Sequence, residues 1–576
     1  MKSLFAVLAL CFFVLPAIAF DREAFTFTRY DLTVTVDPGQ QRLGVRGKIV
    51  LHNDSAVAQQ NAVLQISSSL HWATIQIGGK RAIFATQTYN SDIDHTGALS
   101  EAIVSLPVAV APKQTLELEV GYEGVIPQDT TRLTRIGVPA DTAKHSDWDQ
   151  ISAAFTAVRG IGYVAWYPIA TEAANMSDAS SVSEAVGRWK QREQYAGMRV
   201  QFTYSSEGPV PELYCNGAGH LLEHQQMSRA NQSSNQCEFE PVASRVPLFL
   251  VGSFQALDRA AVNVSFISEH KTEADNYASA AEQVSPFIVR WFGEHRVRPE
   301  FKATIVELAA PNASPFQSGN MLLTPLTDDD TSMLLSAVQL LTHVAFPSPR
   351  PWISEGLARY AAVRYVEQEK TRDTALNYLE SHRAGLTEAE SPMGLNSDYS
   401  AERSLINATD EFYVQTKAMN VWWMLRDLVG EAALTAALHN YKADDDRDAM
   451  YMQKLLETQS HRDLTWFFDD WVYRDRGLPD LRVESVFARP IVSGGYIVTV
   501  TVENLGRAAA EVPVTLQMVS GEATEKLLIP AKSKASVRIT AGSAPMKATV
   551  NDGSVPESDM TNNTYTISAT ELNSNH

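Results

Sequence analysis

The stretch that most constrains this chain is residues 328–360, which reads as two helices joined by a proline-rich turn. Asp329 or Asp330 can cap the first helix, whose apolar residues recur every three or four positions. Three prolines within residues 347–351 then prevent the helix from continuing, because proline lacks an amide hydrogen and clashes with the preceding turn. We expect a mostly buried first helix and a second helix that carries Glu355 near its start.

The second helix resembles a segment of a known family. Its letters WISEGLARY (352–360) are similar to the W-x-N-E-G-F-A-x-Y sequence around the third zinc ligand of the aminopeptidase N (membrane alanyl aminopeptidase) family of gluzincin metallopeptidases. In that family the first helix reads H-E-x-x-H, where two histidines four residues apart hold zinc and the glutamate is the general base. The resemblance implies a thermolysin-like, mainly helical domain in which Glu355 and His343 occupy two of the three ligand positions.

The zinc motif itself departs from the family pattern. The first helix reads QLLTH, which puts Gln339 where the first histidine belongs and Leu340 where the general base belongs. A glutamine offers a neutral amide oxygen, which is a poor substitute for imidazole on zinc. The resemblance therefore implies either a zinc site made of His343, Glu355 and a weak Gln339, or no zinc. The alternative to a metal site is that both residues have only structural roles. His343 would then be a packed core residue, and the charge of Glu355 would interact favourably with the helix dipole in the first turn.

The chain begins with the pattern of a secretory signal peptide. Residues 1–19 contain Lys2, a short apolar run and an A-x-A cleavage pattern before Phe20. No cysteine follows to carry a lipid, and no other stretch approaches the ~20 apolar residues of a membrane span. We expect a secreted or periplasmic protein without a transmembrane segment in the mature chain.

Cysteine usage predicts one disulfide. Cys11 leaves with the signal peptide, so the mature chain keeps only Cys215 and Cys237. In an oxidising compartment such a pair is most simply a disulfide, which would contribute roughly 3 kcal/mol by restricting the unfolded chain. Two free thiols are the alternative.

The charge balance narrows the classes of partner. The 576-residue chain carries 48 Lys and Arg against 67 Asp and Glu, a formal net charge of −19. Such an excess of negative charge argues against nucleic acids and anionic membrane surfaces as partners. A peptide or protein ligand fits better with the resemblance to a peptidase.

Residues 20–254 read as an antiparallel β domain. Four segments between residues 25 and 124 alternate apolar and polar side chains between turn signals. Their opening and the segment GYVAWYPIA (162–170) are similar to the saddle domain of the aminopeptidase N family. Residues 220–224 also fit the inverted zinc motif H-x-x-E-H. The surrounding glycines and polar run favour a hairpin there instead.

Residues 255–480 read as the peptidase-like domain. A helix over 271–295 and two strands precede the helix pair, as in the aminopeptidase N family. In that family the second strand carries G-A-M-E-N, whose glutamate holds the free amine of the substrate. Here SGNMLLTP occupies this place and has no acidic residue, although the backbone of an edge strand can still pair with an extended peptide.

One aromatic residue near the start of the next helix is a candidate catalytic group. Residues 410–441 resemble the family segment in which a tyrosine hydroxyl stabilises the oxyanion of the tetrahedral intermediate. Ungapped alignment puts Val414 on that tyrosine, with Tyr413 one residue earlier. We therefore name Tyr413 as the candidate, against the alternative that it packs at the start of the helix.

Residues 481–576 change character again. Apolar and polar residues alternate with turn signals about every ten residues, which predicts a β-sandwich of about seven strands. The segment resembles the immunoglobulin-like modules of the CARDB type. An acidic and amide-rich run over 551–563 can be read as calcium ligands or, more simply, as turns.

Two functions compete on this sequence. In the first, the protein has lost its chemistry and acts as a peptide-binding or scaffolding protein. In the second, it is a zinc peptidase that uses His343, Glu355 and an unidentified third ligand. Loss of a general base typically removes about 10²–10⁴ in rate, so the first reading is preferred.

Overall fold

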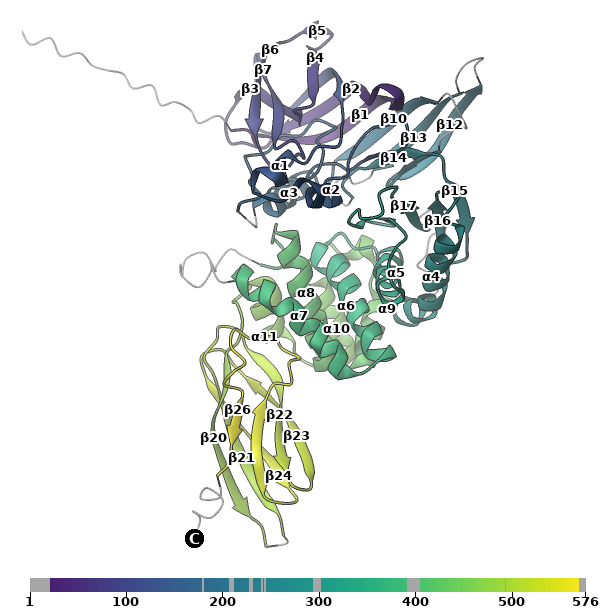
Figure 1. The fold of residues 1–576 in the computed structure, drawn as a ribbon. Coiled ribbons are helices and arrows are strands. Elements are labelled where there is room, and N and C mark those ends of the chain that lie inside the picture. Colours follow the sequence, from purple (N-terminus) through teal and green to yellow (C-terminus); the bar gives the residue numbers. More distant parts are fainter. Residues whose placement is uncertain are drawn as a thin grey trace, which may run out of the picture.

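The structure is a computed structural model that describes residues 21–568 except 179–180, 207–211, 227–230, 240–241, 243–244, 294–301, 391–403 and 493. Its parts follow one another along the molecule (Figure 1): a β-rich part in purple to teal, a helical part in green, and a sheet-rich part in yellow at the opposite end. The expected multidomain α+β architecture is therefore confirmed. The proposed signal peptide (1–19) lies outside the described residues, and the domain limits at 254 and 480 stay predictions.

The N-terminal part is built on an eight-stranded sheet with strand order β12-β13-β10-β1-β2-β8-β4-β5. Alternate residues of its strands are buried, so one face packs on the core and the other meets solvent. All neighbouring strands are antiparallel except β1 and β10, which are parallel because β10 joins the free edge of β1 after a long excursion. The strands are β1 (Phe25–Asp37), β2 (Arg42–Asn53), β4 (Leu70–Ile77), β5 (Lys80–Arg81), β8 (Thr115–Val125), β10 (Gly197–Ser206), β12 (Ala218–Gln226) and β13 (Asn231–Phe239).

Two smaller sheets and three short helices complete this part. The segment 160–170 runs through its core, where Trp166 and Tyr167 are fully buried. The sheets have the orders β3-β7-β6 and β11-β14-β9. The remaining elements are β3 (Gln59–Ser67), β6 (Ile83–Asn90), β7 (Ala98–Val110), β9 (Thr156–Val158), β11 (Glu212–Cys215), β14 (Phe249–Gly252), α1 (Thr131–Arg135), α2 (Ala140–Ser146), α3 (Ser181–Arg192) and the 3-10 turn η1 (Pro38–Gln40).

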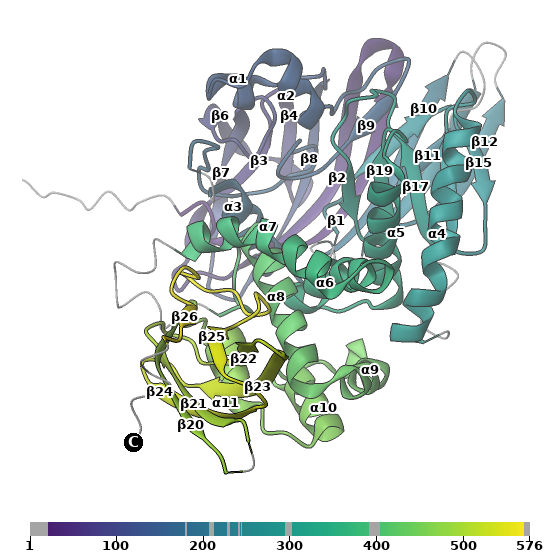
Figure 2. The ribbon, with the colours of Figure 1, turned by 60° about the horizontal axis from the view of Figure 1, so that its bottom comes forward.

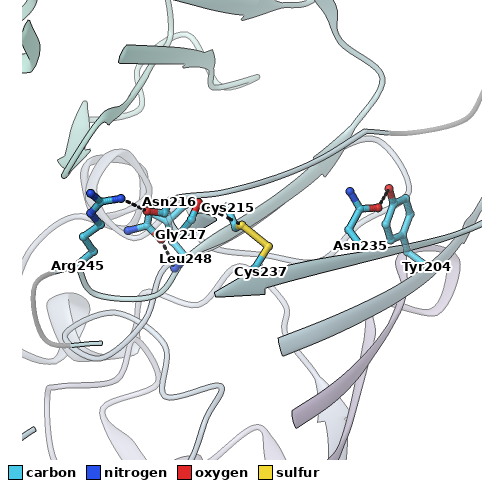
Figure 3. The surroundings of a disulfide bond; sticks show 8 residues. All are labelled: Tyr204, Cys215, Asn216, Gly217, Asn235, Cys237, Arg245 and Leu248. Carbon is cyan, nitrogen blue, oxygen red and sulfur yellow. Dashed lines mark hydrogen bonds between the residues drawn. A yellow bond between two sulfur atoms is a disulfide. The ribbon is translucent and has the colours of Figure 1, made fainter. Parts of the chain in front are cut away.

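The predicted disulfide is present. Cys215, at the end of β11, is joined to Cys237 in β13 (Figure 3). Residues 220–224 lie on strand β12 of this hairpin, so the backbone there is extended. The inverted zinc motif needs a helix, and this stretch does not form one.

A five-stranded sheet introduces the helical part, with the order β15-β16-β17-β19-β18. Strand β18 forms an antiparallel edge hairpin with β19 that the sequence did not reveal. The strands are β15 (Gln255–Asp258), β16 (Val262–Phe266), β17 (Ala303–Glu307), β18 (Phe316–Ser318) and β19 (Met321–Thr324).

The helices pack below this sheet and around one another (Figure 2). Residues 410–441 form two helices, because Gly430, whose φ is 84°, ends α8 and lets α9 begin. The helices are α4 (Lys271–Phe292), α5 (Asp330–Ala345), α6 (Pro351–Glu369), α7 (Arg372–Glu390), α8 (Glu411–Val429), α9 (Glu431–Asn440), α10 (Tyr451–Ser460), α11 (Thr465–Phe468), the 3-10 turn η7 (Ala443–Asp445) and the π turn η8 (Asp469–Tyr473). Among the residues described, no helix is long and apolar enough to span a membrane.

The C-terminal part has two sheets, β20-β21-β24 and β23-β22-β25-β26. It is fixed to the helices because Trp471 Nε1 donates to the carbonyl of Ala509 at 2.9 Å and Arg372 contacts both Asp427 and Asp552. The strands are β20 (Leu481–Pro490), β21 (Tyr496–Asn504), β22 (Ala510–Met518), β23 (Gly521–Ile529), β24 (Lys534–Ala541), β25 (Pro545–Val550) and β26 (Thr564–Thr566).

The amide-rich run over 551–563 forms a loop organised around Glu557. Its buried carboxylate accepts hydrogen bonds from the Leu481 amide at 2.7 Å, from Asn563 Nδ2 at 2.7 Å and from Asn551. Donor N–H groups therefore surround this carboxylate. A cation would need oxygen ligands there, so the arrangement favours the turn interpretation over a calcium site.

Candidate functional site

The site lies on the helix pair α5 and α6. Asp329 caps α5, because its carboxylate accepts hydrogen bonds from the amides of Thr331 and Ser332 at 2.9 and 3.1 Å. The apolar face of α5 then packs into the helical core, and the helix ends at Ala345 before the prolines. This places His343 in the last turn of α5, as the sequence predicts.

A polar network holds the turn between the two helices. The hydroxyls of Ser348 and Tyr441 lie 2.8 Å apart, and Tyr441 donates to Asp446 at 2.8 Å. Arg350 Nε donates to the other oxygen of Asp446 at 2.6 Å. The turn is thereby tied to residues that follow α9, and the start of α6 is fixed relative to the end of α5.

Close packing fixes α6 against α8. A side-chain carbon at Gly356 would lie only 2.5 Å from Ala418 Cβ, so only glycine allows the two helices to approach this closely. One turn earlier the indole rings of Trp352 and Trp422 stack with centroids 5.4 Å apart. Glu355 lies beside this contact and is therefore held in place by the helix that carries it.

His343 and Glu355 face each other directly. His343 Nε2 lies 3.1 Å from Glu355 Oε1, and the two side chains are 13% and 29% exposed. Two groups share the other ring nitrogen: the carbonyl of Gln339 at 3.0 Å and Gln317 Nε2, on the edge strand β18, at 2.9 Å. The Gln317 amide can donate to the neutral ring and the Gln339 carbonyl can accept from the protonated ring. In both states Nε2–H donates to Glu355.

The second oxygen of Glu355 also has a partner. Gln415 Nε2, on α8, donates to Oε2 at 3.3 Å, and Arg359 donates to the carbonyl oxygen of Gln415 at 2.8 Å. Lys190, on α3 of the β-rich part, also approaches Glu355. Its ammonium lies 2.9 Å from the carboxylate of Glu411 at the start of α8. One amide, that of Gln415, and the three cations His343, Lys190 and Arg359 therefore surround the carboxylate.

These surroundings move both pKa values toward an ion pair. Burial by itself would raise the pKa of Glu355, but His343, with help from Lys190 and Arg359, lowers it to about 2. Burial would lower the pKa of His343, and the adjacent carboxylate instead raises it above the usual value. The pair is an imidazolium and a carboxylate in mildly acidic solution.

The residues at the site do not fit a catalytic zinc ion. Within the described part of the chain, no three His, Cys, Asp or Glu side chains are grouped so that they could hold a metal. Gln339 offers its backbone carbonyl to the His343 ring, and the nitrogen that would bind zinc donates to Glu355 instead. Leu340, at the position of the general base, is fully buried in the core. The roles of His343, Glu355 and Gln339 as metal ligands stay predictions.

Tyr413 is not at the surface of the site. Its side chain is fully buried, with the Lys417 ammonium 5.5 Å from the ring centroid. The α8 residue that does face Glu355 is Gln415, two positions later. The hydroxyl is buried in this arrangement, and an oxyanion role for Tyr413 stays a prediction.

Arg245 lies beside the segment that replaces the family's amine-binding glutamate. Gly319, in the turn between β18 and β19, has a φ of 59°, and a side-chain carbon there would lie 2.8 Å from Arg245 Nε. Arg245 also donates to the carbonyl of Asn216 at 3.1 Å (Figure 3). The Asn216 side chain in turn donates to Ser318 Oγ at 2.9 Å and so ties the disulfide hairpin to the edge strand.

Sequence reasoning missed Gln317, Gln415 and Arg245. Gln317 lies on β18, Gln415 on α8 and Arg245 in the segment before β14, so none belongs to the motif that identified His343 and Glu355. The sequence contains only an indirect signal for them. Since the family's zinc motif is incomplete here, other polar side chains must form hydrogen bonds with the two ligand residues that remain.

Comparison with known proteins identifies the fold. No family model matches the chain, and no curated protein matches it. Among solved structures, Legionella pneumophila aminopeptidase A in complex with aspartic acid aligns with a TM-score of 0.60 at 11% identity, over 96% of this chain and 61% of that one. An M1 zinc metallopeptidase from Deinococcus radiodurans aligns with a TM-score of 0.49 at 15% identity, over 80% of this chain and 96% of that one. The chain therefore shares its fold with the aligned 61% of this aminopeptidase A.

Proposed function

We propose that this chain is an exported peptide-binding protein built on a metallopeptidase fold, and that it does not hydrolyse peptides. The observation that carries the proposal is the direct contact between His343 and Glu355, with amides of Gln317 and Gln415 on their outer atoms. The proposal includes the QLLTH motif as a degenerate zinc site, cleavage after residue 19, and a CARDB-type module over 481–576.

The chemistry of the pair supports the loss of catalysis. To bind zinc, His343 must give up the Nε2 hydrogen that Glu355 accepts, and the ion pair must part. A catalytic zinc site normally has three protein ligands and an open position, and only two candidate ligands of the usual types meet here. The position of the general base holds a buried leucine.

The edge strand β18 supports peptide binding. It pairs with β19 on one side, and its Gln317 side chain touches His343. An extended peptide can add to such an edge through backbone hydrogen bonds. It would then pass Phe316 and Tyr163, two half-buried rings whose centroids lie 5.4 Å apart, before it reached the pair.

One observation favours the second candidate function, a zinc-dependent peptidase. The two side chains that the resemblance names as ligands already lie within 3.1 Å of each other. Elemental analysis of the purified mature protein separates the two functions. We expect less than one tenth of an equivalent of zinc and no turnover of amino-acid amides with added zinc. Turnover that a chelator and His343→Ala both abolish would refute the proposal.

Peptide binding has its own test. The probe is a library of extended hexapeptides blocked at both ends, and binding is followed by fluorescence anisotropy. Gln317→Pro should weaken binding at least tenfold, because proline removes a backbone donor from the edge strand. The matched control Gln317→Ala keeps the backbone and should stay within threefold. Equal binding by both variants would place the peptide elsewhere.

A further inference from the structure

The exposed face of the eight-stranded sheet contains a hollow of about 1120 Å³. It lies over β1, β2, β4 and β8, in the β-rich part of the molecule, and none of the residues that form the His343 site lines it. Small-molecule sites usually measure roughly 300–1,000 Å³, so the hollow is large enough for several linked monomer units. A ligand in this hollow would not touch the proposed peptide-binding site.

Packing does not require a glycine at one position on the floor of the hollow. Gly44 is near the start of β2, has no positive φ, and no atom lies within 4 Å of where its side-chain carbon would be. Gly47 and Gly121 nearby differ, since a side-chain carbon there would meet Asp31 O at 2.1 Å and Thr74 Oγ1 at 2.7 Å. Glycine inside a strand costs about 0.5–1 kcal/mol relative to alanine. A glycine inside a strand often marks a bulge, a tight bend, or a place where a ligand or another backbone approaches closely. The pairing of β2 shows no register shift at Gly44, so a bulge does not explain this glycine.

The charges around the hollow cancel. Three cations and three anions line it, and neighbouring strands pair them: Arg42 lies 2.8 Å from Glu123, and Lys48 lies 3.8 Å from Glu119. Asp37 accepts a hydrogen bond from the amide of Gln40 at 3.1 Å. With no net charge the hollow has no preference for phosphate, for lipid headgroups or for a charged peptide.

The floor combines hydrogen-bonding groups with a comparable area of carbon surface. Its uncharged side chains include Thr33, Thr35, Thr74 and Gln76. The larger apolar residues that contribute to the lining point into the core, as shown by Tyr122, which is 2% exposed. A ligand that fits is neutral, flat enough to lie on a sheet, and rich in groups that both donate and accept hydrogen bonds.

We propose that this face of the sheet binds a neutral oligosaccharide chain, with the sugar ring closest to the backbone lying over Gly44. Hydroxyl groups can pair with threonine, carboxamide, guanidinium and carboxylate groups at once, and they need no counter-charge. The absence of side-chain atoms at Gly44 lets a ring reach the strand itself.

Isothermal titration calorimetry on the full mature chain tests this proposal. The probes are soluble oligosaccharides of glucose (α- and β-linked), mannose, galactose, xylose and N-acetylglucosamine, with oligogalacturonate as the anionic comparison. At least one neutral chain should bind, and Gly44→Trp should weaken it at least tenfold. Thr35→Tyr, at an exposed position on the same floor, should do the same and covers the case that the first variant folds poorly.

Gly542→Trp is the matched control, because Gly542 lies in the turn between β24 and β25 and also has no atom within 4 Å of its side-chain position. It should bind within twofold of the unmodified protein. The proposal is overturned if no neutral chain in the panel binds, if only oligogalacturonate or a blocked peptide binds, or if folded Gly44→Trp and Thr35→Tyr bind as tightly as the control.

Discussion

Two glutamates in different parts of the molecule, one half-buried and one fully buried, have opposite pKa shifts. Glu355, on α6, faces the His343 ring and has a pKa of about 2. Glu193, just after α3, is fully buried and accepts a hydrogen bond from the Tyr30 hydroxyl at 2.9 Å. Burial raises the pKa of Glu193 to about 8, and Arg192 opposes this only partly.

The comparison shows that burial alone does not decide the charge of a carboxyl group. A cation at hydrogen-bond distance keeps Glu355 ionised. Glu193 accepts a hydrogen bond from a hydroxyl group, which does not offset the effect of burial, so Glu193 is protonated at neutral pH. The first carboxylate can attract a ligand or a metal. The second acts as a neutral hydrogen-bonding group within the core of the β-rich part.

The largest effect on stability is expected for a buried carboxylate that has neither a cation nor a hydroxyl group as a partner. Leu340→Glu, which would restore the family's general base, buries a carboxylate in the apolar core of α5. Loss of about 3–5 kcal/mol of unfolding free energy is expected. Urea denaturation followed by circular dichroism measures it. The control Gln339→Glu, at a half-buried position one residue earlier, should lose far less. Equal stability of the two variants would show that α5 presents position 340 to solvent.

Glu193→Gln tests the neutral member of the comparison. The folded pKa of about 8 exceeds the unfolded value of 4.5, so the stability that Glu193 contributes is complete below pH 4.5 and is lost as the pH rises through 8. Glutamine does not ionise and avoids this loss. The variant should therefore gain about 3 kcal/mol relative to the parent between pH 5 and pH 9. Urea unfolding at both pH values measures the gain, and a constant difference would mean that Glu193 is charged in the fold.

His343→Gln tests the charged member. The pair contributes most between pH 4.5 and 6.5, the unfolded values of the two groups, where both partners are ionised in the native state. Its contribution falls as the pH drops toward 2, when Glu355 takes up a proton, and also as the pH rises through the raised pKa of His343. The variant should lose roughly 1–2 kcal/mol at pH 5.5 and less at pH 9. A double-mutant cycle with Glu355→Gln isolates the pair. A coupling energy that does not change with pH would contradict this assignment.

The smallest effect on stability, and the most informative for chemistry, is expected from Gln339→His. Position 339 is half-buried one turn before His343, so two imidazoles would share a helix face with Glu355 opposite. Stability should change by less than about 1 kcal/mol. Equilibrium dialysis should show one bound zinc per chain, which the parent and Gln339→Asn lack. A variant that stays metal-free would mean that the ion pair outcompetes zinc even with three ligands.

Much of the fold could be predicted from the sequence because its signals are local. The cap at Asp329, the helix end before Pro347 and the alternating strands of the sandwich follow from neighbouring residues. The approach of His343 to Glu355 was also expected, since a motif places both on paired helices. The disulfide followed from the count of cysteines.

The rest depended on contacts between segments far apart in the chain. Tyr413 was a candidate because of its position in an alignment, and its side chain is buried in the helical core. The parallel pairing of β1 with β10 has no local signal. The end of α8 at Gly430 also has no clear signal, because helical periodicity continues on both sides of this residue.

Asn216 joins the two parts of the protein that the proposed peptide would touch. Its side chain donates to the carbonyl of Val246 and to Ser318 Oγ, both at 2.9 Å, and accepts from the amide of Leu248 at 3.0 Å. A residue of the β-rich part, next to a disulfide, thus sets the position of an edge strand that belongs to the sheet of the helical part. The helical part produced alone would present a frayed edge, and any peptide would have to order that strand as it bound. On the proposed function, both parts are needed to build the peptide-binding edge.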